Sequence, residues 1–213
     1  MKWGNRRNFC IALGLLAAFA AWTAAVRTID VQTIGPNGSA VGFGTFNLAF
    51  HMLTGVHWSL YTITDWLGLV PVGFAFGFAC LGLAQWTERK SLLKVDRSIL
   101  ALGGFYLSVV AAYLFFEEFV VNYRPVLIGG YLEASYPSST TLLVLCVMPT
   151  AAMQLWGRIR HRTFRRWICI LIVAFTAFMV LGRLVSGVHW ITDIVGGGLL
   201  SAGLVMAYAA FSE

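Results

Sequence analysis

The run from Gly182 to Asp193 holds the residues best suited to catalysis. Arg183, His189 and Asp193 lie there among mostly apolar neighbours, with His189 and Asp193 four residues apart. If the chain is helical from this point on, the imidazole and the carboxylate share one face of the helix. A carboxylate in that place holds an imidazole in one tautomer, as an orienting group does behind a nucleophile or base. The competing interpretation of this run alone is a polar turn at the start of a helix.

Two other polar stretches also lie between apolar segments. The first runs from Glu117-Glu118 to Arg124-Pro125, and the second is Pro137-Ser138-Ser139-Thr140-Thr141. Taken singly, each has a purely structural explanation. The residue before a proline tends to leave the helical region, and serine is a common N-cap of helices.

Together, the three stretches suit a phosphoryl group. A serine-rich turn that opens a helix presents backbone N–H groups and the positive end of the helix dipole to an anion. Arg124 and Arg183 can clamp the non-bridging oxygens by bidentate contacts. His189, oriented by Asp193, can attack phosphorus and carry it as a phosphohistidine. The sequence therefore predicts a site for phosphoryl transfer.

These side chains must be positioned by helices that cross a membrane. Of the 213 residues, 59% are hydrophobic and 11% are charged, whereas a soluble domain has about 25% charged residues. The mean hydropathy is +0.77, and several long apolar runs predict an all-α bundle of transmembrane helices. The net charge of +6 sits in short loops rather than in a basic domain, so nucleic acid is not an expected partner.

Six spans are predicted, each near the ~20 residues that a helix needs to cross the hydrocarbon. They cover about Asn8–Val26, Thr62–Gln85, Ser98–Phe119, Ser139–Trp156, Trp167–Val185 and His189–Phe211. The first is longer than the core of a secretory signal, which favours an uncleaved span. We interpret the chain as one membrane domain, in which residues 1–97 hold two spans and residues 98–211 form the catalytic core.

Basic residues predict the orientation of the spans. Twelve of the fifteen Lys and Arg residues precede the first span, or lie between spans two and three or spans four and five. The positive-inside rule therefore predicts that both termini are cytoplasmic and that the polar stretches face outward. The exceptions are Arg27, Arg124 and Arg183. Two of these three belong to the candidate site, where anion binding explains them.

The connection between the first two spans, about Arg27–Tyr61, is long. It starts polar and glycine-rich and becomes amphipathic over Phe46–Leu53. We expect an irregular outer loop and a short helix in the membrane interface, which caps the site. Its sequence Gly-Val-His-Trp at 55–58 recurs at 187–190, and we attribute this echo to chance or to interfacial anchoring. The four cysteines lie in apolar segments without the spacing of metal ligands, so no metal or redox site is predicted.

The three polar stretches resemble the motifs of the type-2 phosphatidic acid phosphatase family, membrane enzymes related to the vanadium haloperoxidases. The family pattern is Lys-x6-Arg-Pro, then Pro-Ser-Gly-His, then Ser-Arg-x5-His-x3-Asp, spread over six spans on the extracytoplasmic side. The resemblance covers roughly Ser98–Phe211. It implies a phosphatase that needs neither a metal nor another cofactor and acts on a phosphorylated lipid.

The resemblance also implies roles for individual residues. The phosphate-binding residues would be Arg124, Ser138, Ser139 and Arg183, with His189 as the nucleophile and Asp193 as its orienting carboxylate. The chain departs from the family pattern at four positions: Glu117 replaces the lysine, Ser139 the glycine, Thr140 the histidine that acts as general acid, and Gly182 the leading serine.

Thr140 is the departure with the largest chemical consequence, because a threonine hydroxyl cannot act as a general acid near neutral pH. Three explanations stay open. The leaving group is good enough unaided, as when a lipid monophosphate leaves a diphosphate. A nearby glutamate (Glu117, Glu118 or Glu133) keeps its proton through partial burial. Or the site binds a phosphorylated lipid without turnover.

The expected function is hydrolysis of a lipid phosphate or diphosphate through a phosphohistidine at His189. Candidate substrates are isoprenoid diphosphates such as undecaprenyl diphosphate, which Thr140 favours, and phosphatidate-like lipids. The alternatives are a lipid phosphotransferase and a non-catalytic membrane protein that binds lipid phosphates. The short loops fit a bacterial cytoplasmic membrane, with the site on its extracytoplasmic face.

Overall fold

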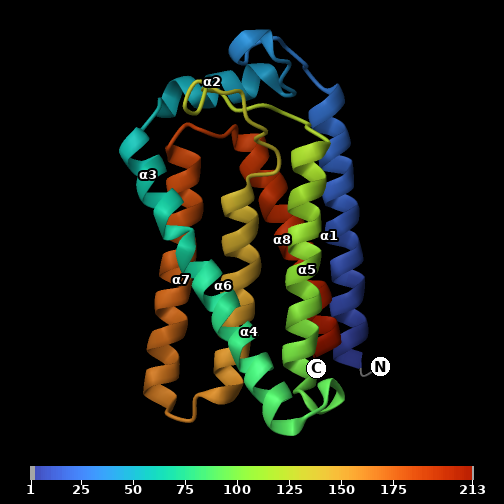
Figure 1. Ribbon diagram of the computed structural model, residues 1–213. Coiled ribbons are helices and arrows are strands. Elements are labelled where there is room, and N and C mark those ends of the chain that lie inside the picture. Colours follow the sequence, from blue (N-terminus) through green and yellow to red (C-terminus); the bar gives the residue numbers. More distant parts are fainter. Residues whose placement is uncertain (1–2, 213) are drawn as a thin grey trace.

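The computed structural model describes residues 3–212 and is built from α-helices (Figure 1). Within that part of the chain the helices are α1 (Trp3–Thr28), α2 (Gly44–Thr54), α3 (Trp58–Leu67), α4 (Leu69–Arg89), α5 (Arg97–Glu118), α6 (Ser139–Arg158), α7 (Arg162–Val185) and α8 (Ile191–Ser212). Short 3-10 turns occur at Pro36–Gly38 and Leu92–Lys94. The predicted all-α class is confirmed.

The prediction of six spans is also confirmed. Six helical stretches in residues 3–212 are long and apolar enough to cross a membrane, and the chain is an integral membrane protein. The second stretch runs from Trp58 to Arg89, because α3 continues into α4 through Gly68, whose backbone keeps helical angles (φ −58°, ψ −19°). The predicted second span, about Thr62–Gln85, is therefore extended at both ends.

Helix α8 lies inside the bundle and relies on glycines for close packing. A Cβ atom on Gly203 would lie 2.8 Å from Cδ2 of Leu16 on α1, and one on Gly196 would lie 2.6 Å from Cε2 of the Tyr136 ring. Both distances are shorter than real carbon contacts, so any larger residue would push these neighbours away. The glycines thereby set how closely α1 and the loop before α6 approach α8.

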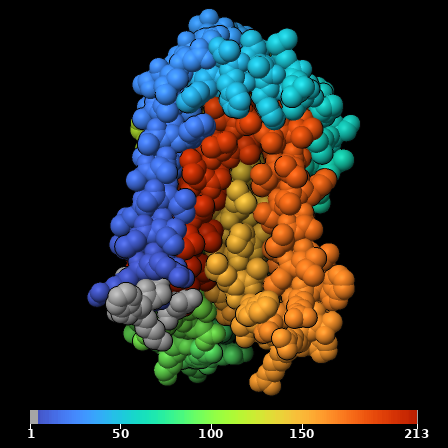
Figure 2. Space-filling view, turned by 180° about the vertical axis from the view of Figure 1, so that it is seen from behind, coloured from blue at the N-terminus to red at the C-terminus, as the bar shows by residue number. Residues whose placement is uncertain are grey.

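The bundle is hollow on the face that Figure 2 shows. Figure 2 shows α1 and α7 standing apart, with α8 and α6 visible between them below α2. Helix α8 is therefore covered by α1 along its length but not by α7. The site described below lies at the end where α2 crosses the bundle and where α6 and α8 begin (Figure 1).

The two ends of the bundle differ in charge. The α4–α5 and α6–α7 connections lie at the same end as the two chain termini, whereas α2 and the connections α5–α6 and α7–α8 lie at the other end (Figure 1). The connections at the first end hold Arg89, Lys90, Lys94, Arg97, Arg158, Arg160, Arg162, Arg165 and Arg166. This basic end is the one that the positive-inside rule assigns to the cytoplasm, and the polar motifs lie at the opposite α2 end.

Helix α2 is the predicted interfacial helix, and it lies across the end of the bundle (Figure 1). Its outer side exposes large apolar side chains, among them Phe46, Met52 and Leu53. Its inner side buries Asn47, whose amide donates to the Gly42 carbonyl at 2.8 Å and to Thr192 Oγ1 at 2.9 Å. The polar side of α2 is thus fixed to the first turn of α8.

The two Gly-Val-His-Trp segments are in contact. The backbone N–H of His57 donates to the Ser186 carbonyl at 2.9 Å. Gly187 has a positive φ of 70°, and a Cβ there would lie 1.8 Å from the Gly55 carbonyl oxygen. Glycine is required at 187 on both grounds. This crossing places the start of α3 against the turn between α7 and α8.

Candidate active site

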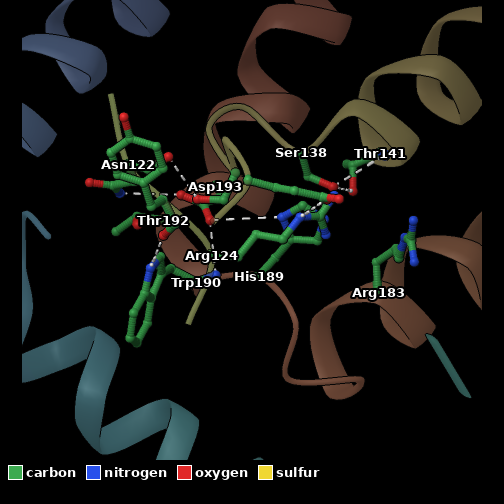
Figure 3. A network of polar contacts seen from close by, with 12 residues as sticks. Asn122, Arg124, Ser138, Thr141, Arg183, His189, Trp190, Thr192 and Asp193 are labelled. Atoms are coloured by element: carbon green, nitrogen blue, oxygen red, sulfur yellow. Dashed lines mark hydrogen bonds and ion pairs between the residues drawn. The ribbon is translucent and has the colours of Figure 1, made fainter. Parts of the chain in front are cut away.

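His189 is buried in the turn between α7 and α8, with only 3% of its surface exposed. Its Nε2 lies 3.1 Å from Nη1 of Arg124. A guanidinium group only donates hydrogen bonds, so Nε2 accepts and the proton of the neutral ring sits on Nδ1. The ring nitrogen with the free lone pair therefore faces a cation, as Figure 3 shows.

Asp193 lies on the other side of the same ring. Its Oδ2 is 3.9 Å from His189 Nδ1, which is an ion-pair distance but too long for a hydrogen bond. The carboxylate is completely buried, and it accepts from the backbone N–H of Trp190 at 2.9 Å and from the Asn122 amide at 3.3 Å. Contacts in unliganded sites are often long and tighten when the substrate binds.

The expectation that His189 and Asp193 share a helix face is wrong in detail. Helix α8 begins at Ile191, so His189 lies in the turn before it. Asp193 is the third residue of the helix, and its side chain reaches back to the N–H of Trp190, which is one half of a capping box. The same carboxylate thus caps α8 and faces the imidazole.

The surroundings of His189 lower its pKa well below the ordinary value. Burial is the largest cause, because it penalises the charged imidazolium, and the positive charges of Arg124 and Arg183 act in the same direction. The ring is therefore neutral at neutral pH. A neutral imidazole keeps the lone pair that a nucleophile needs.

Arg124 is held by the loop between α5 and α6. Its backbone N–H donates to the Glu133 carbonyl at 3.0 Å, which closes the loop on itself. Its side chain is buried, and Nε lies 3.0 Å from Oε2 of Glu133. The Nε–H does not point at that oxygen, so the contact is an ion pair rather than a hydrogen bond. Glu133 is 43% exposed at its side chain.

The serine-rich turn opens α6 as predicted, and its residues divide into two roles. Ser138 is buried and caps the helix: its Oγ accepts from Thr141, and its own N–H donates to the Asp193 carbonyl at 3.1 Å. Ser139 and Thr140 are the first two residues of the helix. Their N–H groups have no acceptor within the helix, and they lie at its positive end.

Arg183 is buried and points toward α3, apart from the His189 pair (Figure 3). Its Nη2 lies 2.9 Å from Oδ1 of Asp65 and 2.6 Å from Oγ1 of Thr140. Its guanidinium carbon lies 4.8 Å from the centre of the Tyr61 ring, a cation–π contact. The second arginine of the site is therefore occupied by residues of α3 and α6.

Two cavities meet at the start of α6. An apolar cavity of about 320 Å³ lies between α3, α5 and α6, and its lining includes Val109, Leu143, Thr140 and Asp65. A polar cavity of about 500 Å³ lies under the α5–α6 loop, and its lining includes Arg124, Glu117 and Glu133. Ser139 and Tyr113 line both cavities. A ligand with an apolar tail and an anionic head would fit across this junction.

The sequence model of the PAP2 superfamily matches residues 72–213, well over half of the chain. The chain belongs to the PAP2 superfamily. This membership confirms the resemblance to type-2 phosphatidic acid phosphatases and extends it from residue 98 back into α4.

A solved PAP2 structure has the same fold. The crystal structure of a transmembrane PAP2 type phosphatidylglycerolphosphate phosphatase from Bacillus subtilis matches with a TM-score of 0.55 and 19% identity, over 93% of each chain. No curated protein matches the sequence. Because it covers 93% of the chain, the structural match extends into the residues before 72, which the PAP2 model does not match.

The PAP2 motifs converge in this chain. One connected group is formed by Arg124, Ser138, His189 and Asp193. Arg183 is linked to the start of α6 through Thr140. The glutamates proposed as substitute acids are separated: Glu117 lines the polar cavity with Arg124, whereas Glu118 is exposed on α5 and lines neither cavity.

Two polar residues of this PAP2 site were missed by reasoning from sequence. Asn122 is buried and binds Asp193. Its signal was its place two residues before Arg124. Asp65 binds Arg183, and its signal was a carboxylate inside an apolar span, which by itself indicates a functional group.

The described residues of the PAP2 site supply charge through side chains and a helix end. In residues 3–212 no three His, Cys, Asp or Glu side chains come together in a group that could hold a metal ion. The four cysteines are free. The cations that can face a phosphate are Arg124 and Arg183, supported by the N-terminal end of α6.

Proposed function

We propose that this PAP2 protein is a membrane lipid phosphatase that acts through a phosphohistidine at His189. The observation that carries the proposal is the position of His189 Nε2, which faces Arg124 at 3.1 Å while Asp193 lies behind Nδ1. A phosphoryl group attacked by this nitrogen would have its oxygens close to the buried guanidinium of Arg124. That positive charge would stabilise the oxygens during the attack.

The first chemical step joins Nε2 to phosphorus. The Nε2 lone pair forms the P–N bond and the P–O bond to the leaving group breaks. The electron pair of that bond leaves on the lipid alcohol oxygen or, for a diphosphate, on the bridging oxygen of the lipid monophosphate. Arg124 now blocks Nε2, so it must turn toward the phosphoryl oxygens as the substrate enters. Glu133 is half-exposed and can stay in water when Arg124 exchanges it for phosphate.

The second step hydrolyses the phosphohistidine and regenerates the free enzyme. Water attacks phosphorus, the P–N electrons go back to Nε2, and inorganic phosphate leaves. Asp193 stabilises the positive ring of the intermediate, because it is a buried carboxylate held by Trp190 and Asn122. The free N–H groups of Ser139 and Thr140 are placed to bind the phosphoryl oxygens.

The substrate class follows from the cavities. A lipid tail would fit the apolar cavity between α3, α5 and α6, and its phosphate would lie at the start of α6. The structurally similar Bacillus subtilis protein is described as a phosphatidylglycerolphosphate phosphatase, which makes a lipid monophosphate one candidate. A lipid diphosphate such as an isoprenoid diphosphate is the other, because its leaving group needs less help where Thr140 replaces a histidine.

The site is proposed to face away from the cytoplasm. It lies at the α2 end, while the basic connections lie at the opposite end (Figure 1), and the positive-inside rule assigns the basic end to the cytoplasm. The proposed place is a bacterial cytoplasmic membrane, with the reaction on the extracytoplasmic face.

The test is phosphate release from a lipid monophosphate and a lipid diphosphate by the purified protein in detergent, beside His189→Ala. Release that the substitution abolishes supports the proposal. Product analysis with an added alcohol acceptor separates a hydrolase from a phosphotransferase. Binding of both lipids by wild type and variant alike, without release, would establish the non-catalytic alternative instead.

A further inference from the structure

The place of the family's general acid is taken by Thr140, and a carboxyl group of α3 lies close to it. Nη2 of Arg183 contacts Oγ1 of Thr140 and Oδ1 of Asp65 at once. The hydroxyl and the carboxylate are therefore neighbours across a single nitrogen atom. No motif of the sequence indicates Asp65, because it belongs to a span outside the three motifs.

Asp65 opens into the cavity that suits the lipid. Asp65, Ser139 and Thr140 all line the apolar cavity between α3, α5 and α6. The Asp65 side chain is 57% exposed, although its partner Arg183 is buried. A carboxyl group at the junction of tail and phosphate would stand beside the oxygen that joins them, which is the leaving oxygen of a phosphate monoester.

The position of Asp65 is fixed by packing of α3 on α7. The preceding residue, Thr64, is buried, and its Oγ1 lies 3.5 Å from Nη1 of Arg183. A Cβ on Gly182 would lie 2.7 Å from the Thr64 methyl group, so glycine at 182 lets α3 approach. Two departures from the family pattern thus agree: Gly182 admits α3, and the short Thr140 leaves room for its carboxylate.

We propose that Asp65 is the catalytic acid for the leaving lipid oxygen, in the role that a histidine at position 140 has in the family. The inference rests on the proposed phosphatase function and names the residue that function lacks. Glu117 is less suited, because it lines the polar cavity with Arg124 rather than the apolar cavity with Thr140.

The proton balance is complete with the substrate alone. Without substrate, Asp65 is the counter-ion of Arg183. An incoming phosphate monoester takes Arg183, and its monoanion carries a proton, since the second pKa of such a group is about 6. That proton passes to Asp65, whose charge is no longer balanced by the arginine. When the P–O bond breaks, the Asp65 proton goes to the lipid oxygen, giving the alcohol. Asp65 then takes a proton from the water that attacks the phosphohistidine, passes it to the departing phosphate, and pairs again with Arg183 as a carboxylate.

The decisive experiment compares Asp65→Asn with wild type on a lipid monophosphate and a lipid diphosphate, with His189→Ala as the inactive control. The monophosphate has a poor leaving group, so its kcat should fall about 10²-fold, the usual contribution of a general acid. The kcat for the diphosphate should change far less, because its leaving group needs little help from an acid.

Inhibition by inorganic phosphate separates catalysis from positioning. If Asp65 only holds Arg183 in place, Asp65→Asn should weaken phosphate inhibition and raise KM for both lipids alike, and that result overturns the proposal. Wild type that hydrolyses the diphosphate but never the monophosphate would overturn it as well. Wild type that releases phosphate from neither lipid would reject the phosphatase function itself.

Rescue provides a second, independent test. Thr140→His in the Asp65→Asn background restores the residue of the family motif. The double variant should recover monophosphate hydrolysis at least about tenfold over Asp65→Asn, because one acid replaces another. Hydrolysis of the monophosphate by Asp65→Asn at the wild-type rate, so that nothing needs rescue, would contradict the assignment.

Discussion

The two sides of the candidate site are built differently. On the nucleophile side, His189 and Asp193 are almost wholly buried, and the carboxylate is fixed by Trp190 and Asn122. On the leaving-group side, Asp65 is 57% exposed and faces a cavity. In the proposed mechanism, the side that would form the P–N bond is buried, whereas the side that would meet the lipid is open.

The two arginines of the site also combine a buried group with an exposed one. Each buried guanidinium is paired with one half-exposed carboxylate, Arg124 with Glu133 and Arg183 with Asp65. A buried cation needs a partner at all times, and an exposed carboxylate can be given up to water. In the proposed mechanism, phosphate binding is therefore an exchange of one anion for another at each arginine.

The largest effect is expected on the rigid side, from Asp193→Asn. The amide cannot stabilise the positive ring of the phosphohistidine, so kcat should fall about 10³- to 10⁴-fold, as for loss of the carboxylate behind a catalytic histidine. Steady-state phosphate release measures it. A loss below tenfold would mean that the 3.9 Å contact between His189 and Asp193 never tightens.

Arg124→Ala should have the next largest effect. It removes one charged donor from the transferring phosphoryl group, which costs about 10²- to 10³-fold in kcat. Arg124→Lys is the matched control, since it keeps the charge but loses the planar donor set. Equal activity of wild type and Arg124→Ala would show that Arg124 only covers His189 and does not take part in the reaction.

The burial of His189 predicts a dependence of stability on pH. The pKa of His189 in the folded protein is well below its unfolded value, which is about 6.5. Between these two pKa values the unfolded chain binds a proton that the folded site does not. The free energy of unfolding is therefore not reduced by His189 above about pH 6.5. It falls as the pH drops below that value toward the folded pKa.

The thermal unfolding midpoint in detergent, measured between pH 7.5 and 5, tests this dependence. The midpoint of wild type should fall more steeply with acid than that of His189→Gln, whose amide does not titrate. Parallel curves for the two proteins would show that other groups dominate the acid response.

The smallest effect is expected at the glutamates near the end of α5. Glu118→Gln removes a charge that lines neither cavity, so activity should stay close to that of wild type. Glu117→Gln alters the polar cavity and should still lose less than the ~10² expected for a general acid. Phosphate release from a lipid monophosphate compares the two, and a 10²-fold loss in Glu117→Gln would transfer the acid role from Asp65 to Glu117.

Much of the fold was predictable because the hydropathy of a membrane protein indicates which segments cross the membrane. Six apolar runs and the placement of basic residues predicted the spans and the two ends of the bundle. They also predicted that Arg124, Ser138 and His189 meet at one end, because alternate connections of a bundle lie on the same side. Helix α2 was predictable from the amphipathic run at Phe46–Leu53.

The rest depended on packing that no local pattern encodes. The pairing of Asp65 with Arg183 follows from the register of α3 on α7, which Thr64 and Gly182 determine. The echo of Gly-Val-His-Trp was no guide to a repeat, yet Gly55 and Gly187 cross in space. The start of α8 was misplaced because the capping role of Asp193 was overlooked in favour of its catalytic one.

The even number of spans has a practical consequence for anyone who handles this protein. Helix α1 begins and α8 ends at the basic end, the full length of the bundle away from the α2 end (Figure 1). A group attached at either terminus will therefore not obstruct the proposed site at the α2 end. Such a group could be a purification tag, a fluorescent reporter or a surface tether. Molecules immobilised in this way should all present the same reactive face to added lipid.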